Sequence, residues 1–299
     1  MKTLTIPAST DGLALSVAVC APETPPKAIF QIVHGMAEHK ERYYEFMEFL
    51  ASNGYVAVAG DLRGHGESVK DEEDLGYLYA GGWRAMVEDV KVVQDWAGKE
   101  YPGLPVTLFG HSMGSLVVRS YAKRYDDRID KLIVCGSPSD NPVKGIGLAL
   151  AGLIGKLKGP RHRSNLLNQM SFGSFNKPFK ADGPFAWLSK NHENVLSYRK
   201  DPLCGFCFTV NGFQGLLRLM RDCYDPKDWL MSKPELPIRF ISGGNDPCRL
   251  SDKAFRKAVS FLQNCGYRRV ESKLYPTLRH EILHEEAPEV FTDILKFIA

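Results

Sequence analysis

Five short runs of β-branched and aromatic residues recur along the chain and are separated by longer segments with helical spacing. Each run ends at Gly, Asp or Ser, as strands do where they pass into loops: AIFQIVHG, YVAVAGD, VTLFGHS, KLIVCGS and PIRFISGG. The helical spacing is found near residues 40–53, 82–99, 114–125, 250–264 and 288–298. Together with an opening pair of strand-like stretches, this alternation predicts an α/β fold, with a mostly parallel central sheet flanked by helices.

One segment breaks the alternation. Residues 138–232 separate the KLIVCGS strand from the PIRFISGG strand, where a single helix would suffice. Its runs GIGLALAGLIG and CGFCFTVNGFQGLLRLM are apolar and helical in character. We therefore expect a core domain made of residues 1–137 and 233–299, with residues 138–232 inserted as a helical cap. Most apolar residues of the cap would pack it onto the core, and a minority would line a pocket.

The composition is that of a folded, globular protein. Of the 299 residues, 44% are apolar and 24% are charged, a balance that allows a substantial core. The 38 basic and 35 acidic residues leave a formal charge of +3, which is too small to predict a nucleic-acid partner. The one basic cluster is typical of a solvated face and consists of Lys156, Lys158, Arg161, His162 and Arg163.

Signals for secretion, membrane insertion and metal binding are weak. The opening stretch MKTLTIPASTDG lacks the apolar run of a secretory signal, and no segment reaches the length of a membrane span. The seven cysteines are an odd number and scattered, which predicts reduced thiols in a cytoplasmic protein. Cys204 and Cys207 form a lone CxxC without nearby His partners, so we expect thiols and no metal there. The sequence calls for no cofactor and leaves the oligomeric state open.

The strongest chemical signal is Gly110-His111-Ser112-Met113-Gly114, a GxSxG motif. It lies directly after the VTLF strand and directly before the helical run LVVRSYAKRY. A sharp turn from strand to helix crowds the backbone, so glycine on either side relieves the crowding while the serine side chain points outward. The motif in this context predicts that Ser112 is a nucleophile.

A serine hydroxyl needs a histidine to accept its proton and a carboxylate to orient that histidine. In hydrolases with this turn, the acid and then the histidine follow the serine along the chain. Asp246 follows the PIRFISGG strand at once, and His280 is the first histidine after the last strand, so these two complete the predicted triad. We expect His284 to be structural, because a metal pair with His280 would lack a third ligand. The acids expected to cap helices or face solvent are Asp222, Asp225 and Asp228.

Acyl transfer also requires donors for the oxyanion of the tetrahedral intermediate. Two backbone N–H groups supply them in such hydrolases, one from the residue after the serine and one from a loop after an earlier strand. These are predicted to be Met113 and Met36, the latter in the loop HGMAEH. The loop Asp61-Leu62-Arg63-Gly64-His65-Gly66-Glu67-Ser68 also looks catalytic, but since the triad is complete without it, we expect structural support.

These motifs together resemble the α/β-hydrolase superfamily, and within it the branch of monoacylglycerol lipases and lysophospholipase-like enzymes, grouped with serine aminopeptidases. The resemblance spans nearly the whole chain and is carried by HGMAEH, DLRGHGES, YPGLPVTLFGHSMGS, GGNDPCRLSDKAF and RHEILHEEAPEV. It implies a helical cap over an acyl site, Ser112 as nucleophile with Asp246 and His280, and oxyanion donors at Met36 and Met113. The chain departs from the family at Ala37, where members often have glycine.

The expected function is therefore cleavage of carboxylic esters through an acyl-enzyme, with a small-molecule acyl ester as substrate and a lipid ester as one candidate. An aminopeptidase, an amidase or a thioesterase would use the same triad, so these alternatives stay open. A noncatalytic binding protein on a hydrolase scaffold is the alternative from another class. Transient contact of the cap with a membrane surface is a further expectation.

Overall fold

The structure is a computed structural model that describes residues 1–299, and its centre is an eight-stranded sheet in the order β1-β2-β4-β3-β5-β6-β7-β8. The strands are β1 (Lys2–Pro7), β2 (Ala14–Cys20), β3 (Ala28–Val33), β4 (Tyr55–Gly60), β5 (Val106–His111), β6 (Lys131–Cys135), β7 (Ile238–Gly243) and β8 (Val270–Tyr275). β2 pairs antiparallel with β1 and with β4, and all other neighbours are parallel. The predicted fold class is confirmed.

The sheet is buried on both faces because its strands are apolar at almost every position. Side chains alternate between faces along a strand. In β3, Ile29 and Val33 join an apolar cluster of 47 residues, whereas Phe30 and Ile32 join a second cluster of 25 residues on the opposite face. A near-continuous apolar run is therefore what a parallel strand between two helical layers requires.

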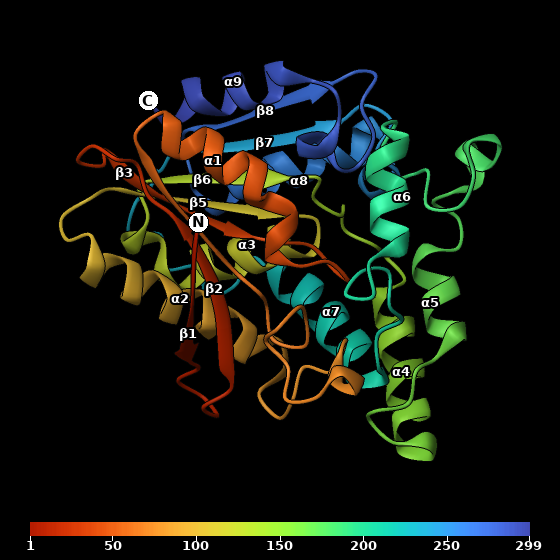
Figure 1. The fold of residues 1–299 in the computed structure, drawn as a ribbon. Helices are drawn as coiled ribbons and strands as arrows, with labels where there is room; N and C mark the ends of the chain where they lie inside the picture. The colour runs from red at the N-terminus through yellow and green to blue at the C-terminus, as the bar shows by residue number, and fades with distance from the viewer.

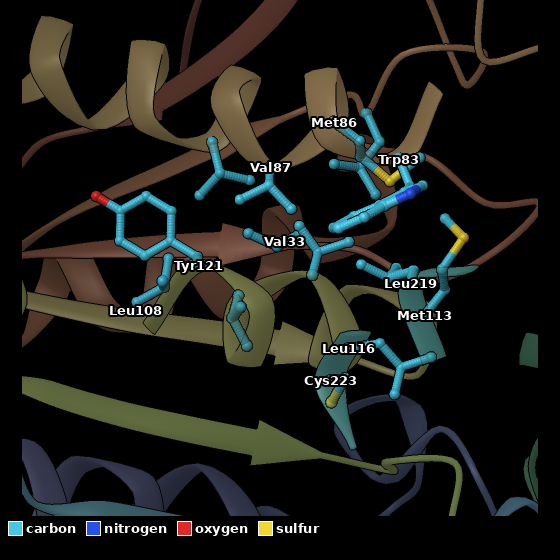
Figure 2. Packing of buried hydrophobic residues seen from close by; sticks show 14 of the residues in the cluster. Val33, Trp83, Met86, Val87, Leu108, Met113, Leu116, Tyr121, Leu219 and Cys223 are labelled. Carbon is cyan, nitrogen blue, oxygen red and sulfur yellow. The ribbon is translucent and has the colours of Figure 1, made fainter. Parts of the chain in front are cut away.

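Helices cover both faces of the sheet, as Figure 1 shows. The smaller cluster lies under α1 (Tyr44–Ser52) and α9 (Pro288–Ile298), and the larger lies under α2 (Gly82–Glu100), α3 (Met113–Tyr125) and α8 (Asp252–Cys265). Figure 2 shows side chains of the larger cluster packed between the sheet and the helices, among them Val33 of β3 and Val87 of α2. The five helical segments expected from sequence spacing are thus all present.

Residues 138–232 contain four α-helices and do not form a single separate layer. These helices are α4 (Lys144–Lys158), α5 (Asn165–Phe172), α6 (His192–Lys200) and α7 (Val210–Cys223). α4, α5 and α6 lie beyond the carboxyl ends of the parallel strands (Figure 1), whereas α7 adds Phe213 and Leu219 to the larger core cluster. α7 therefore joins the insertion to the main core against α2 and α3.

Short 3-10 helices mark several loops: η1 (Lys40–Tyr43), η2 (Glu72–Asp74), η3 (Asp126–Arg128), η4 (Lys177–Asp182), η5 (Pro247–Arg249) and η6 (Ile282–His284). No helix combines the length and the apolar character needed to cross a membrane.

The strand order places a crevice at a defined edge of the sheet. From β3 the chain continues to β4 on one side and later to β5 on the other, so the order reverses between β3 and β5. In such sheets, ligands bind in the crevice outside the carboxyl ends of the strands at this point. The loops that follow β3 and β5 carry HGMAEH and GHSMG, the two motifs with the clearest chemistry.

Candidate active site

Ser112 occupies a strained turn between β5 and α3. Its φ of 51° and ψ of −117° fall where residues other than glycine are rare. The flanking glycines are required for close contact: a Cβ on Gly110 would lie 2.4 Å from the carbonyl oxygen of Gly114, and one on Gly114 would lie 2.2 Å from that of Val33. The turn thus holds Ser112 at the sheet edge, with its side chain in the main cavity.

Asp246 and His280 are brought together although they are far apart in sequence. Asp246 follows β7, and its carboxylate accepts hydrogen bonds from the Cys248 N–H at 2.8 Å and from the Ser242 hydroxyl at 3.0 Å. Nδ1 of His280 lies 2.9 Å from Oδ1 of Asp246. Burial opposes protonation of His280, but the Asp246 carboxylate outweighs it, so the pKa of His280 lies above its usual value. The pair is a buried, oriented imidazole and carboxylate.

Ser112 and His280 line the same cavity, where the histidine ring is held by neighbouring groups. Its centroid lies 4.7 Å from that of His111 and 5.0 Å from that of Trp187, and its Nε2 lies 3.9 Å from the sulfur of Cys248. The Ser112 hydroxyl forms no hydrogen bond within the protein. In many enzymes, the hydrogen bond between the nucleophile and its base becomes short only when substrate binds.

His284 lies in a different environment from His280. Its Nε2 is 2.8 Å from the carbonyl oxygen of Arg42, and its ring packs edge-on against Tyr43. Burial and the positive charge of Arg42 lower the pKa of His284 to about 4. A neutral imidazole bonded to the backbone is a structural group, and of these two histidines only His280 forms a close pair with a carboxylate.

In the loop after β3, the backbone N–H of Met36 is left without an acceptor in the protein. The N–H of Gly35 donates to Oε1 of Glu38 at 2.5 Å. The N–H of Met36 has no protein acceptor, and Met113 is the first residue of α3, whose N–H has no partner within the helix. Both residues line the cavity beside Ser112. Two free donors at this position suit an oxyanion.

Ala37 adopts the left-handed conformation in that loop, with a φ of 54°. This is the position at which the resemblance in sequence leads to the expectation of glycine. The loop therefore keeps the backbone path that glycine would favour, and an alanine in this region of φ and ψ carries strain of about 1–2 kcal/mol.

Glu38 is the centre of a buried network that sequence reasoning missed. It accepts hydrogen bonds from Tyr43 at 3.0 Å and Arg42 at 2.8 Å, and its Oε1 is 3.1 Å from Nδ1 of His111. Burial disfavours the Glu38 carboxylate, but His111 and Arg42 outweigh it, so the pKa of Glu38 lies well below its usual value. One carboxylate thus links the loop of Met36 to the residue preceding Ser112.

Arg42 extends this network to the insertion. Its guanidinium donates to Glu281, the residue after His280, at 2.6 and 2.8 Å, and to Asn194 of α6 at 2.9 Å. Nothing in the pattern of HGMAEH and its flanks distinguishes these inward charges from surface charges. The same holds for Cys248 and Trp187, which contact the His280 ring without any local sequence signal.

The loop from Asp61 to Ser68 supports the site from below. The Asp61 carboxylate accepts hydrogen bonds from the backbone and side chain of Lys40 at 2.8 Å, and Arg63 pairs with Asp89 at 2.6 Å. Burial lowers the pKa of His65 to about 3, so this histidine is neutral. The loop ties strand ends together and does not line the main cavity, in agreement with the structural role expected from the sequence.

The cavity above Ser112 has a volume of about 280 Å³ and lies between the sheet edge and the insertion. Sixteen of its 29 lining residues are hydrophobic. The insertion supplies most of the apolar wall, including Phe172, Phe175, Phe185, Trp187, Leu216, Leu217 and Met220. The cavity thus has a polar floor, which includes Ser112 and His280, and a mainly apolar wall.

Two clusters contain side chains of the kinds that bind metals: His39 with Asp201 and Cys204, and Asp246 with Cys248 and His280. In each cluster the imidazole is already paired with the carboxylate, at 2.8 Å and 2.9 Å. These pairs account for both arrangements without a bound ion. Cys207, the other thiol of the CxxC motif, belongs to neither cluster.

This architecture defines the chain as an α/β hydrolase. The family model described as serine aminopeptidase, S33 matches residues 24–287, and the chain belongs to that family. It is 26% identical to a monoacylglycerol lipase of Mycolicibacterium smegmatis, over 97% of this chain and 95% of the relative. It is also 26% identical to a monoglyceride lipase of Mus musculus, over 95% and 85% respectively. A thermostable carboxyl esterase from Bacillus coagulans, solved with glycerol, superposes with a TM-score of 0.91 at 25% identity, covering 99% of this chain and 97% of that one. The chain lies in the monoacylglycerol lipase-like branch and is an ester hydrolase of the lipase and esterase type.

Proposed function

We propose that this protein is a serine hydrolase that cleaves carboxylic esters through an acyl-enzyme, with monoacylglycerols or lysophospholipids as the substrate class. The observation that carries the proposal is the meeting, in one apolar cavity, of the strained Ser112 with the buried pair of Asp246 and His280. The relatives named monoacylglycerol lipase and monoglyceride lipase support the lipid substrate.

In this mechanism His280 takes the proton of Ser112 as the serine oxygen attacks the ester carbonyl. The N–H groups of Met36 and Met113 stabilise the oxyanion, and Asp246 stabilises the imidazolium that forms. His280 then protonates the departing alcohol, leaving an acyl-enzyme. A water molecule, deprotonated by His280, releases the acid and regenerates Ser112.

The cavity lining favours an acyl chain over a peptide. A peptide amino terminus would need an unpaired carboxylate, and the only acids that line the cavity, Glu38 and Glu281, are both paired with Arg42. Hydroxyl and amide side chains in the same lining can bind the hydroxyls of a polyol leaving group. These side chains are Ser139, Asn141, Asn168, Ser171 and Ser174. We therefore place esters ahead of aminoacyl amides. Nothing in the cavity separates oxygen esters from thioesters, and a noncatalytic role fits poorly with a complete triad.

Residues 138–232 act in this proposal as the cap, which selects the acyl chain and contacts lipid. Large apolar residues are exposed on α4, α5 and the segment before α4: Val143, Ile146, Leu153, Leu157, Leu166 and Met170. Basic residues lie in the same segment, including Lys144, Lys156, Lys158, Arg161 and Arg163. Exposed apolar side chains with basic neighbours suit an anionic lipid surface. The seven free cysteines suit the reducing cytoplasm.

The test is hydrolysis by the purified protein and its Ser112→Ala variant. The panel spans p-nitrophenyl esters of increasing chain length, a monoacylglycerol, a lysophospholipid, a thioester and an aminoacyl amide. We expect ester cleavage that rises beyond acetyl and is lost in the variant. Preferential cleavage of the amide would move the protein to the peptidases, and silence on every substrate would contradict an enzymatic role. Co-sedimentation with anionic and zwitterionic vesicles tests the lipid contact. We expect the protein to bind the anionic vesicles, and the Leu157→Asp variant to bind them more weakly than the wild type.

A further inference from the structure

The loop that carries His280 is bonded to the insertion as well as to the core. Residues 279–285, here named the histidine loop, lie between β8 and α9 and include η6. Residues 182–191, here named the strap, connect η4 to α6 in the insertion. Two charged side chains of the histidine loop, Arg279 and Glu285, bind the main chain of the strap.

Arg279 donates from the histidine loop to the strap. Its Nη1 is 2.7 Å from the carbonyl oxygen of Ala186 and 3.2 Å from that of Ser189. Its other terminal nitrogen pairs with Asp182, and its guanidinium lies 4.2 Å from the ring centroid of Phe179. Only 12% of the Arg279 side chain is exposed. A surface ion pair alone would not require this degree of burial.

Glu285 accepts in the opposite direction. Its carboxylate receives hydrogen bonds from the Lys190 N–H at 2.9 Å, from the Ser189 hydroxyl at 2.9 Å and from the Asn191 N–H at 3.3 Å. It also accepts from the Arg279 N–H at 3.0 Å. The two charged residues therefore hold the histidine loop and the strap together mainly through main-chain groups, which substitution at the partner positions would not remove.

His280 lies between the two points where the histidine loop is tied to the strap. The next residue, Glu281, donates its N–H to the carbonyl oxygen of Leu188 at 2.7 Å. Trp187, also in the strap, lies against the His280 ring with 5.0 Å between centroids. The core fixes this ring through Asp246, and the insertion fixes the loop and one side of the ring.

We propose that the strap is a positioning element for His280 and that Arg279 is the positioning residue that couples the two. This inference rests on the proposed function, because it assumes that His280 is the general base. A base must lie within hydrogen-bond reach of the proton that it takes, and displacement by about 1 Å can lower a rate about a hundredfold. The insertion then has a second task besides shaping the acyl pocket: it completes the geometry of the triad.

The competing explanation is that the strap only shapes the wall of the cavity. The two explanations differ for a substrate with a short acyl chain, which makes little use of that wall. Loss of positioning lowers kcat for acetyl and lauroyl esters alike, whereas loss of wall shape raises KM for the lauroyl ester and spares the acetyl ester.

The experiment compares the wild-type protein with Arg279→Met, which keeps an apolar stem over Phe179 but removes the donors, and with Glu285→Gln. Arg279→Lys, which keeps the positive charge and supplies an ammonium group as donor, is the conservative variant. Arg268→Met is the matched control, because Arg268 is exposed and pairs only with the exposed Glu235. The readouts are kcat and KM for p-nitrophenyl acetate and laurate, and amide hydrogen exchange at Glu281.

We expect Arg279→Met to lower kcat on both esters by on the order of tenfold to a hundredfold, with the KM for acetate unchanged and faster exchange at Glu281. Glu285→Gln should have a similar but smaller effect, Arg279→Lys should recover part of the loss, and Arg268→Met should match wild type. A kcat that stays at the wild-type level, or a loss confined to laurate, overturns the positioning role. Unchanged exchange at Glu281 overturns the coupling. If Ser112→Ala retains turnover, the proposed function fails, while hydrogen exchange still decides whether the strap holds the loop.

Discussion

Replacing Glu38 by glutamine perturbs both the stability and the chemistry of the site. The glutamine side-chain oxygen can still accept hydrogen bonds from Gly35 and Tyr43. The glutamine NH2 group then faces the guanidinium of Arg42, so that two hydrogen-bond donors meet. The charge-assisted bond to Arg42 is lost, and the contact with Nδ1 of His111 keeps an oxygen but loses the negative charge; a hydrogen bond to a charged group is worth about 1.5–3 kcal/mol. Arg42 keeps its pairing with Glu281, which limits the penalty. We therefore expect a loss of about 3 kcal/mol in the free energy of unfolding.

The stability change should depend on pH with a defined sign. The folded-state pKa of Glu38 lies well below its usual value, so its contribution is fully present above the unfolded-state pKa of about 4.3 and is lost as pH falls through the folded-state pKa. Urea unfolding at neutral and acidic pH should therefore show the difference between wild type and Glu38→Gln shrinking at acidic pH. Glu235→Gln, an exposed control, should cost less than about 0.5 kcal/mol.

The same substitution should slow catalysis, because Glu38 holds the Gly35 N–H and thereby the loop that presents the Met36 N–H. Complete loss of one oxyanion donor costs about 10²–10³ in kcat. We expect a smaller loss, about 10–100-fold, because glutamine retains an acceptor for Gly35. A stability difference below about 1 kcal/mol at neutral pH, or an unchanged kcat, would refute the reasoning that Glu38 organises both halves of the site.

Further predictions concern three parts of the site: the loop of Met36, the pair of Asp246 and His280, and the apolar wall. Ala37→Gly should be neutral or stabilising by up to about 1 kcal/mol in urea unfolding, because relief of the positive φ offsets the entropy of glycine; a loss of 1 kcal/mol would contradict the strained loop. The activity should fall as pH drops through the raised pKa of His280, and Asp246→Asn should lower kcat about 10⁴-fold; a pH–rate profile with no acid limb would exclude His280 as the base. Phe172→Ala with Phe175→Ala should lower kcat/KM for laurate about tenfold or more and leave acetate nearly unchanged; equal losses on both would remove these rings from the acyl wall.

Much of the fold was predictable because local patterns and long-range packing agree in this chain. Dense β-branched runs such as VTLFGHS form strands buried on both faces, and the helical spacing near 288–298 is that of α9. Ser251 and Gly266 mark the two ends of α8, since the Ser251 hydroxyl accepts from the Ala254 N–H at 3.1 Å and Gly266 adopts a φ of 117°. Such signals lie within a few residues of the elements that they define.

The predicted site residues could be chosen for a similar reason. GxSxG between a strand and a helix fixes where a serine must lie, and the position just past β7 brings Asp246 to the same sheet edge. His280 and His284 could be distinguished only by their order, and the structure supplies the physical difference: one ring meets a carboxylate and the other meets a backbone carbonyl.

The remaining features depend on contacts between residues that are distant in sequence. Arg42 meets Glu281 across 239 positions, and Arg279 meets Ala186 across 93. No local pattern indicates that such charged side chains point into the protein. The packing of α7 into the main core likewise depends on which faces of α2 and α3 the other elements leave uncovered. The insertion was recognisable as an interruption, but its coupling to the histidine loop required the three-dimensional structure.

The central claim is that Ser112 carries the acyl group during turnover, and mass spectrometry of the trapped enzyme tests it most directly. The protein is reacted with an alkyl fluorophosphonate and, separately, quenched in acid during turnover of a p-nitrophenyl ester, and the modified peptide is sequenced. We expect one equivalent of adduct on Ser112 in both cases and none on the Ser112→Ala variant. Modification of another residue, or equal labelling of the variant, would contradict it.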